Sequence, residues 1–188
     1  MGRTSKSRIQ IFLLITLLLV SGCIQRDTQG NLVPDISTHD WEKARVARVV
    51  DGDTLVLDDG RRLRLIGINA PEIGEREEPY GAEASAWLRA TIDGKEIFLQ
   101  KDVSDTDQYG RTLRYVWLST PEKVDDQSAR EWMVSAMMVA QGYAQPYTFP
   151  PDVLYADLLL SLAREARTHE RGLWAINPDG TTRGSPLD

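Results

Sequence analysis

Two acids and two arginines fall in three short segments of the chain. Asp53 lies in an Asp-Gly-Asp-Thr turn, Arg64 and Glu72 begin and end the segment R-L-I-G-I-N-A-P-E, and Arg111 ends the segment D-Q-Y-G-R. One carboxylate can bind a hard divalent cation, a second can accept a proton from water, and two guanidiniums can hold phosphate oxygens bidentately. Taken singly, each segment is also an ordinary turn or strand end. Together they favour a metal-assisted site that cleaves phosphodiesters.

The residues around these side chains predict a meander of three short strands. Residues 44–50, 54–57 and 61–67 are rich in β-branched and aliphatic side chains, and Asp-Gly turn signals separate them. Successive side chains of a strand point to opposite faces, so Leu63 and Leu65 share one face and Arg64 lies on the other.

The remaining pattern predicts an α+β fold. A helix is expected at residues 80–92, strands at 96–100 and 113–118, and helices at 128–142 and 152–168. The spacing of Ser128 and Glu131 is that of a capping box at the start of the first of these last two helices. Five short strands, one inserted helix and two C-terminal helices predict a five-stranded barrel of the oligonucleotide-binding (OB) type. A barrel would bring the Asp53 turn close to the corner at residues 69–72.

The first 22 residues have the layout of a secretory signal. Three basic residues precede the apolar stretch 9–20, and Ser21-Gly22-Cys23 resembles a lipobox, where cleavage precedes a lipidated cysteine. The alternative is an uncleaved anchor helix with a stray thiol. We therefore expect a signal peptide at residues 1–22, a lipidated Cys23 with a flexible tether to residue 40, a domain at 41–175 and a disordered tail at 176–188. The mature protein is expected to be a membrane-anchored lipoprotein outside the cytoplasm.

The charge balance argues against a nonspecific nucleic-acid coat. The full chain carries 22 basic and 28 acidic residues, and loss of residues 1–22 would leave a net charge of −9. Proteins that coat nucleic acid without sequence preference are usually basic. An acidic protein can still act on nucleic acid if its few cations converge at one site. Two histidines without metal-ligand spacing make a zinc site improbable.

The ordered motifs D-G-D-T, R-L-I-G-I-N-A-P-E, D-Q-Y-G-R and Q-G-Y-A resemble those of the staphylococcal (micrococcal) nuclease, or thermonuclease, family. The resemblance covers residues 44–174. It implies that Ca²⁺ is bound by the Asp53 carboxylate, the Asn69 side-chain oxygen and the Ala70 carbonyl. It also implies that Glu72 is the general base.

For the phosphates, the same resemblance implies that Arg64 and Arg111 bind the scissile phosphate and that Tyr109 contacts a neighbouring one. The chain departs from the best-known family pattern at Asn69, where an aspartate is usual. Loss of that negative charge should weaken calcium binding. The loop after Glu72 is also acidic, at Glu75, Glu77 and Glu78, where the best-known member is lysine-rich.

The function that follows is a calcium-dependent endonuclease that hydrolyses DNA and RNA, preferring single strands and leaving 3′-phosphate ends. It would act as a monomer without a protein partner. The alternatives are a nucleic-acid-binding module of the same fold with little catalysis, or a structural lipoprotein. The second alternative leaves the three motifs without a role.

Overall fold

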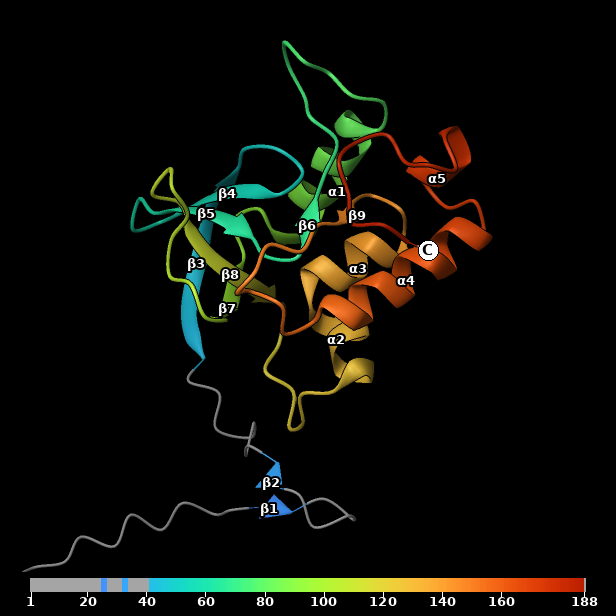
Figure 1. Cartoon of the computed structure of the whole chain (residues 1–188). Coiled ribbons are helices and arrows are strands. Elements are labelled where there is room, and N and C mark those ends of the chain that lie inside the picture. Colours follow the sequence, from blue (N-terminus) through green and yellow to red (C-terminus); the bar gives the residue numbers. More distant parts are fainter. Residues whose placement is uncertain (1–24, 27–31, 34–40, 188) are drawn as a thin grey trace, which may run out of the picture. The chain divides into compact units, whose positions relative to one another are not determined.

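A computed structural model describes residues 25–26, 32–33 and 41–187 (Figure 1). The expected signal peptide and Cys23 lie outside these residues. β1 (Gln25–Arg26) pairs with β2 (Leu32–Val33) in a unit that is separate from the unit Ile36–Asp188. Within the described residues, no helix is long and apolar enough to span a membrane.

The larger unit is built on a closed five-stranded barrel, as expected. Its strands are β3 (Glu42–Val49), β4 (Thr54–Leu57), β5 (Arg62–Leu65), β7 (Glu96–Gln100) and β8 (Thr112–Trp117), in the order β3-β4-β5-β8-β7. β5 and β8 are parallel, and the other pairs are antiparallel. The inward face is aliphatic, with Leu55, Leu63 and Ile97 fully buried. Alternation along each short strand therefore sorts apolar side chains inward and leaves Arg64 off the core.

The helices cover the barrel from one side (Figure 1). α1 (Gly81–Ile92) is inserted between β6 (Ile68–Asn69) and β7, while α2 (Asp126–Trp132), α3 (Val134–Ala140), α4 (Ala156–Thr168) and α5 (Leu173–Ile176) follow the last barrel strand. α3 packs against both α4 and β8. Between α3 and α4, the short strand β9 (Gln145–Pro146) pairs antiparallel with β6. This small second sheet fixes the corner that follows β5.

The helix expected at residues 128–142 is wrong in its start and in its continuity. The capping box is formed by Asp125 and Ser128, since the Asp125 carboxylate accepts from the Ser128 backbone and the Ser128 hydroxyl accepts from that of Asp125. Met133 is extended and buried, forms a β-bridge to Trp117, and so divides α2 from α3. The next helix begins at residue 156, because the Asp152 carboxylate instead accepts hydrogen bonds from the backbone at residues 103 and 104.

The tail beyond residue 176, expected to be disordered, packs against the domain as far as it is described. Leu187 is 7% exposed, and its carbonyl accepts from Arg164 Nε at 2.6 Å. The Ser185 amide donates to the Pro146 carbonyl, also at 2.6 Å. The Pro/Gly/Thr-rich composition suggested disorder because it lacks periodicity, but hydrogen-bonding groups of β9 and α4 hold the segment in place.

Candidate functional site

The turn between β3 and β4 directs Asp53 inward. The Asp51 carboxylate accepts from the backbone amides of Asp53 at 3.0 Å and Thr54 at 2.7 Å, the geometry of an Asx turn. A Cβ on Gly52 would lie 2.4 Å from the Cβ of Ala70. The turn therefore sits directly on the corner after β6, and glycine is required because of that close approach.

The corner itself is made by a change of direction at Gly67, whose φ is +83°. The Gly67 carbonyl accepts from the Tyr147 amide at 2.9 Å, and the Ile66 carbonyl accepts from the buried Ser135 hydroxyl at 3.0 Å. The chain thus leaves the barrel at β5 and joins β9 through β6. Asn69 and Ala70 are carried back toward the Asp53 turn as a result.

Asp53, Arg64, Asn69 and Ala70 form one hydrogen-bonded cluster. Arg64 Nη2 lies 2.9 Å from Asp53 Oδ2 and donates to Asn69 Oδ1 at 3.2 Å. The Ala70 amide donates to Asp53 Oδ2 at 3.0 Å, and the Thr54 hydroxyl donates to Oδ1 at 3.1 Å. Because Thr54 stands opposite Arg64 in the β4–β5 ladder, the strand register places Asp53 next to the arginine.

The surroundings of Asp53 disfavour its ionised form. Burial raises the pKa of Asp53 from 3.8 to about 6, the Asp51 carboxylate adds to the rise, and Arg64 offsets only part of it. Desolvation of a carboxylate favours its neutral form, and a nearby cation favours the charged form. A second cation beside Asp53 would therefore stabilise the ionised carboxylate.

Arg111 reaches the same region from the turn before β8. Its Nε donates to Asp107 Oδ2 at 2.6 Å, and its guanidinium lies 5.5 Å from the centre of the Tyr109 ring. Burial opposes ionisation of Asp107, but hydrogen bonds from the Arg111 backbone and side chain and from the Tyr109 amide hold its pKa below the usual value. The parallel pairing of Leu63 with Thr112 places this turn beside β5 and Arg64.

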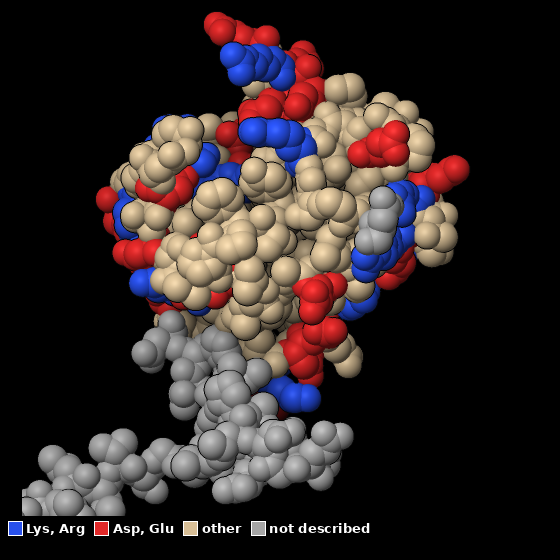
Figure 2. Space-filling view, in the orientation of Figure 1, with Lys and Arg blue, Asp and Glu red and all other residues tan. Residues whose placement is uncertain are grey.

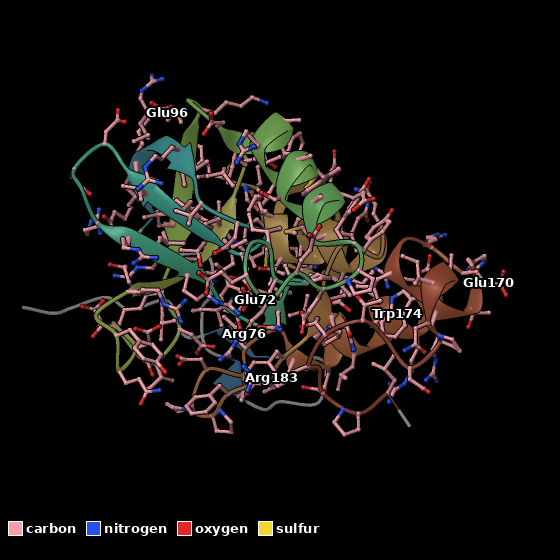
Figure 3. The ribbon with its side chains drawn as sticks, turned by 90° about the horizontal axis from the view of Figure 1, so that it is seen from above. Glu72, Arg76, Glu96, Glu170, Trp174 and Arg183 are labelled. Carbon is pink, nitrogen blue, oxygen red and sulfur yellow. The ribbon has the colours of Figure 1, made fainter. Side chains whose placement is uncertain are left out.

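Glu72 is exposed, and within the described residues its carboxylate makes no hydrogen bond. Its backbone is fixed on both sides, because its amide donates to Glu78 Oε2 at 3.0 Å and its carbonyl accepts from the Glu78 amide at 2.9 Å. The acidic loop thus holds the main chain of Glu72 and leaves the side chain free. Figure 3 labels Glu72 in the region where the corner meets the barrel end.

A cleft of about 670 Å³ unites these side chains. Its lining includes all the predicted site residues of the domain except Ala70, namely Asp53, Arg64, Asn69, Glu72, Tyr109 and Arg111. The Ala70 side chain is buried in the core, and its amide supports Asp53.

Sequence reasoning missed three groups that also line the cleft. Tyr147 and Phe149 lie outside the three motifs, and Phe149 is 71% exposed. Arg183 comes from the tail that was expected to be disordered. Within the chain, no sequence signal marked Arg183, because its position depends on tertiary contacts.

The donor set fits a hard divalent cation. Asp53, the Asn69 amide oxygen and the Ala70 carbonyl are all oxygen donors, the kind that calcium takes. The raised pKa of Asp53 is the observation that supports the fit, since a bound cation would stabilise the carboxylate where burial disfavours it. The described residues include no group of three or more His, Cys, Asp or Glu that could hold a metal. Asp53 is the single carboxylate of the set, so calcium binding should be weak.

The chain is similar to known nucleases. The model of the family described as staphylococcal nuclease homologue matches residues 62–176. The thermonuclease of Staphylococcus intermedius is 32% identical over 139 residues, which cover 71% of this chain and 76% of the relative. The thermonuclease of Staphylococcus hyicus is 30% identical over 74% of this chain and 80% of the relative. An uncharacterized endonuclease of Escherichia coli O157:H7 is 34% identical over 70% of this chain and 76% of the relative.

Proposed function

The chain belongs to the staphylococcal nuclease family and is a nuclease, and on that premise we propose that it is calcium-dependent and hydrolyses DNA and RNA, preferring single strands. The products would carry 3′-phosphate and 5′-hydroxyl ends. The observation that supports this is the convergence of Asp53, Arg64, Glu72 and Arg111 on one cleft, from three segments of the chain.

The two arginines are suited to hold the scissile phosphate because acids already fix their position. Arg64 is braced by Asp53 and Asn69, and Arg111 is braced by Asp107. Each guanidinium has further N–H donors for phosphate oxygens, and the site is formed before substrate arrives.

Glu72 is suited to act as general base. Its carboxylate faces the cleft without a hydrogen-bond partner among the described residues, so it can accept a proton from water. Attack of that water oxygen on phosphorus, with cleavage of the bond to the 5′-oxygen, leaves the phosphate on the 3′ side. The departing 5′-oxygen takes up a proton, and Arg64 and Arg111 stabilise the charge on the equatorial oxygens. When bound at Asp53, Asn69 and Ala70, calcium would neutralise charge on the phosphate.

The experiment is digestion of single-stranded DNA by purified protein that lacks residues 1–22. We expect degradation with Ca²⁺ at alkaline pH, none with EDTA, and products that a polymerase extends only after phosphatase treatment. DNA binding without cleavage would instead identify a binding module, and calcium-independent cleavage would remove the metal from the mechanism.

The matched variants are Glu72→Gln and Glu83→Gln. Glu83 is an exposed acid in the first turn of α1 and does not line the cleft. Loss of the general base should lower turnover by at least about 10²–10⁴-fold, while Glu83→Gln should match the wild type. Near-normal turnover in Glu72→Gln would exclude Glu72 as the base.

A further inference from the structure

The C-terminal segment, defined as residues 180–187, lies beyond the part of the chain that the family model matches and lines the nuclease cleft at Arg183. We propose that this segment holds Arg183 at the cleft and that Arg183 binds a backbone phosphate of the nucleic-acid strand, next to the scissile one. The proposal rests on the proposed function, because it assigns a further substrate contact to the same site.

The segment is clamped around the side chain of Gln145 in β9. The Thr182 amide donates to Gln145 Oε1 at 3.0 Å. A Cβ on Gly180 would lie 2.2 Å from Gln145 Oε1, and one on Gly184 would lie 2.6 Å from Gln145 Nε2. Gln145 is itself buried. Such close approaches on two sides of one side chain indicate a fitted contact.

Further bonds fix the segment beyond Arg183. The Ser185 amide donates to the Pro146 carbonyl, and its hydroxyl accepts from the Thr148 amide at 3.0 Å. Leu187 is buried and its carbonyl is bound by Arg164. The backbone of Arg183 is therefore held between anchored neighbours, and the side chain projects from a fixed point.

Thr182 also contacts the predicted metal corner. The Asn69 amide nitrogen donates to the Thr182 hydroxyl at 2.7 Å, and the Asn69 oxygen accepts from Arg64. An asparagine has one donor end and one acceptor end, so these two bonds together turn its oxygen toward Arg64. An aspartate at this position would have no N–H group to donate to the Thr182 hydroxyl. Thr182 is thus a positioning residue that suits asparagine at position 69.

Arg183 differs from the other cations of the cleft in having no carboxylate partner. The cationic side chains that line the cleft are Arg64, Arg111 and Arg183. The first two are ion-paired with Asp53 and Asp107, whereas Arg183, within the described residues, has neither an ion pair nor a hydrogen bond. In an acidic chain, an unpaired guanidinium in the substrate cleft is the cation with all its donors available to phosphate. Figure 3 labels Arg183 and Glu72, which line the same cleft from different segments.

The first experiment measures binding of a fluorescent single-stranded oligonucleotide in EDTA, where no turnover occurs. Arg183→Ala should raise Kd about three- to tenfold at low salt. It should also reduce the slope of log Kd against log salt by about 0.7, the value for one phosphate contact on a single strand. Arg183→Lys should keep the slope. The control is Arg89→Ala, an exposed arginine of α1 that does not line the cleft.

The second experiment measures digestion with calcium. Arg183→Ala should raise KM with kcat nearly unchanged. Thr182→Val should lower kcat while binding in EDTA stays near that of the wild type, and Thr182→Ser, which restores the hydroxyl, should restore kcat. Thermal unfolding of each variant checks that the domain is folded.

The outcomes separate this proposal from the proposed function. Arg183→Ala with unchanged Kd, salt slope and KM overturns the phosphate contact. Tighter binding or faster digestion in Arg183→Ala also overturns it and would mean that the segment obstructs the cleft. If the wild type fails to digest DNA while Arg183→Ala still weakens binding in EDTA, the nuclease mechanism fails and the phosphate contact stands.

Discussion

Asp53 occupies a position whose surroundings favour its protonated form. It is buried beside Asp51, and one arginine and two hydrogen bonds compensate only in part, so its pKa rises to about 6. The group is at once an expected metal ligand and a source of instability in the metal-free protein. Functional sites often carry such perturbed groups.

The pH dependence of stability in EDTA should reveal Asp53. Its pKa is 3.8 in the unfolded chain and about 6 in the folded one, so the folded state binds the extra proton between these values. The free energy of unfolding should therefore fall as pH rises from about 4 to about 6, by up to about 1.4 kcal/mol per pH unit, and then level off. Asp53→Asn should lose this contribution, and denaturant titrations of both proteins across that range measure it. Parallel curves would contradict the raised pKa.

The residues of the three motifs could be predicted from the sequence because each occurs at a turn or strand end with a recognisable local pattern. The roles of Asp107 and Thr182 could not. Asp107 braces Arg111 from within its own turn, and Thr182 reaches Asn69 across 113 positions of the chain. Period and propensity do not describe a contact as distant as that of Thr182, and they do not show which side chains of a turn bind each other, as at Asp107.

At the scale of elements, the site depends on the contact of the β3–β4 turn with the corner after β6. Gly52 and Ala70 meet where any added methyl group would overlap. The hydrogen bond from the Ala70 amide to Asp53 crosses the same contact. Two loops from separate strands are thereby aligned by packing as well as by polar groups.

Gly52→Ala should separate the turn from the corner. We expect a loss of about 1–3 kcal/mol in the free energy of unfolding, as for other overpacked positions, together with weaker calcium binding. Combining it with Ala70→Gly removes the overlapping Cβ, so the double variant should lose less than the two single variants together. Denaturant unfolding and calcium titration measure the two effects. Strict additivity would mean that the contact does not couple the loops.

The five barrel strands were predicted to within one or two residues because their boundaries are marked by Asp-Gly turns and by alternation, whereas β6 and β9 were not predicted. The helices after β8 were predicted less well. Met133 lies inside an apolar stretch that favours a continuous helix, yet it forms a β-bridge to Trp117. Tertiary pairing thus overrides a local helical preference there. The capping box predicted for Ser128 and Glu131 is wrong, because Asp125 is the cap and Ser128 takes the third helical position.

At the scale of the whole molecule, the charge distribution fits an enzyme that meets its substrate at one site. The chain is acidic, and Figure 2 shows charged side chains of both signs around a broad uncharged area of one face. Long-range attraction of nucleic acid is therefore weak, and binding relies on the arginines of the cleft. The rate of digestion should therefore depend less steeply on salt concentration than that of basic nucleases.

We further propose that the mature chain is anchored to a membrane through a lipid on Cys23, outside the cytoplasm. Support comes from the basic and apolar pattern of residues 1–22 and the Ser-Gly-Cys sequence that ends it. Cys23→Ser should move nuclease activity from the membrane fraction to the soluble fraction of cells that express the full chain. Activity that stays with the membrane in this variant would contradict lipid anchoring and favour an uncleaved helix.

The bond from Asn69 to Thr182 also sets an order of events during synthesis. Asn69 belongs to the first half of the chain, and its partner is made 113 residues later. Contacts between such distant positions form late in folding, since a long loop must close first. A chain that ends before residue 182 can form the barrel, the Asp53–Arg64 pair and the bond from Arg64 to the Asn69 oxygen, but the Asn69 amide nitrogen still lacks its Thr182 acceptor. Asn69 therefore reaches its final orientation only after residue 182 has been added, which places completion of the site near the end of the protein's own production.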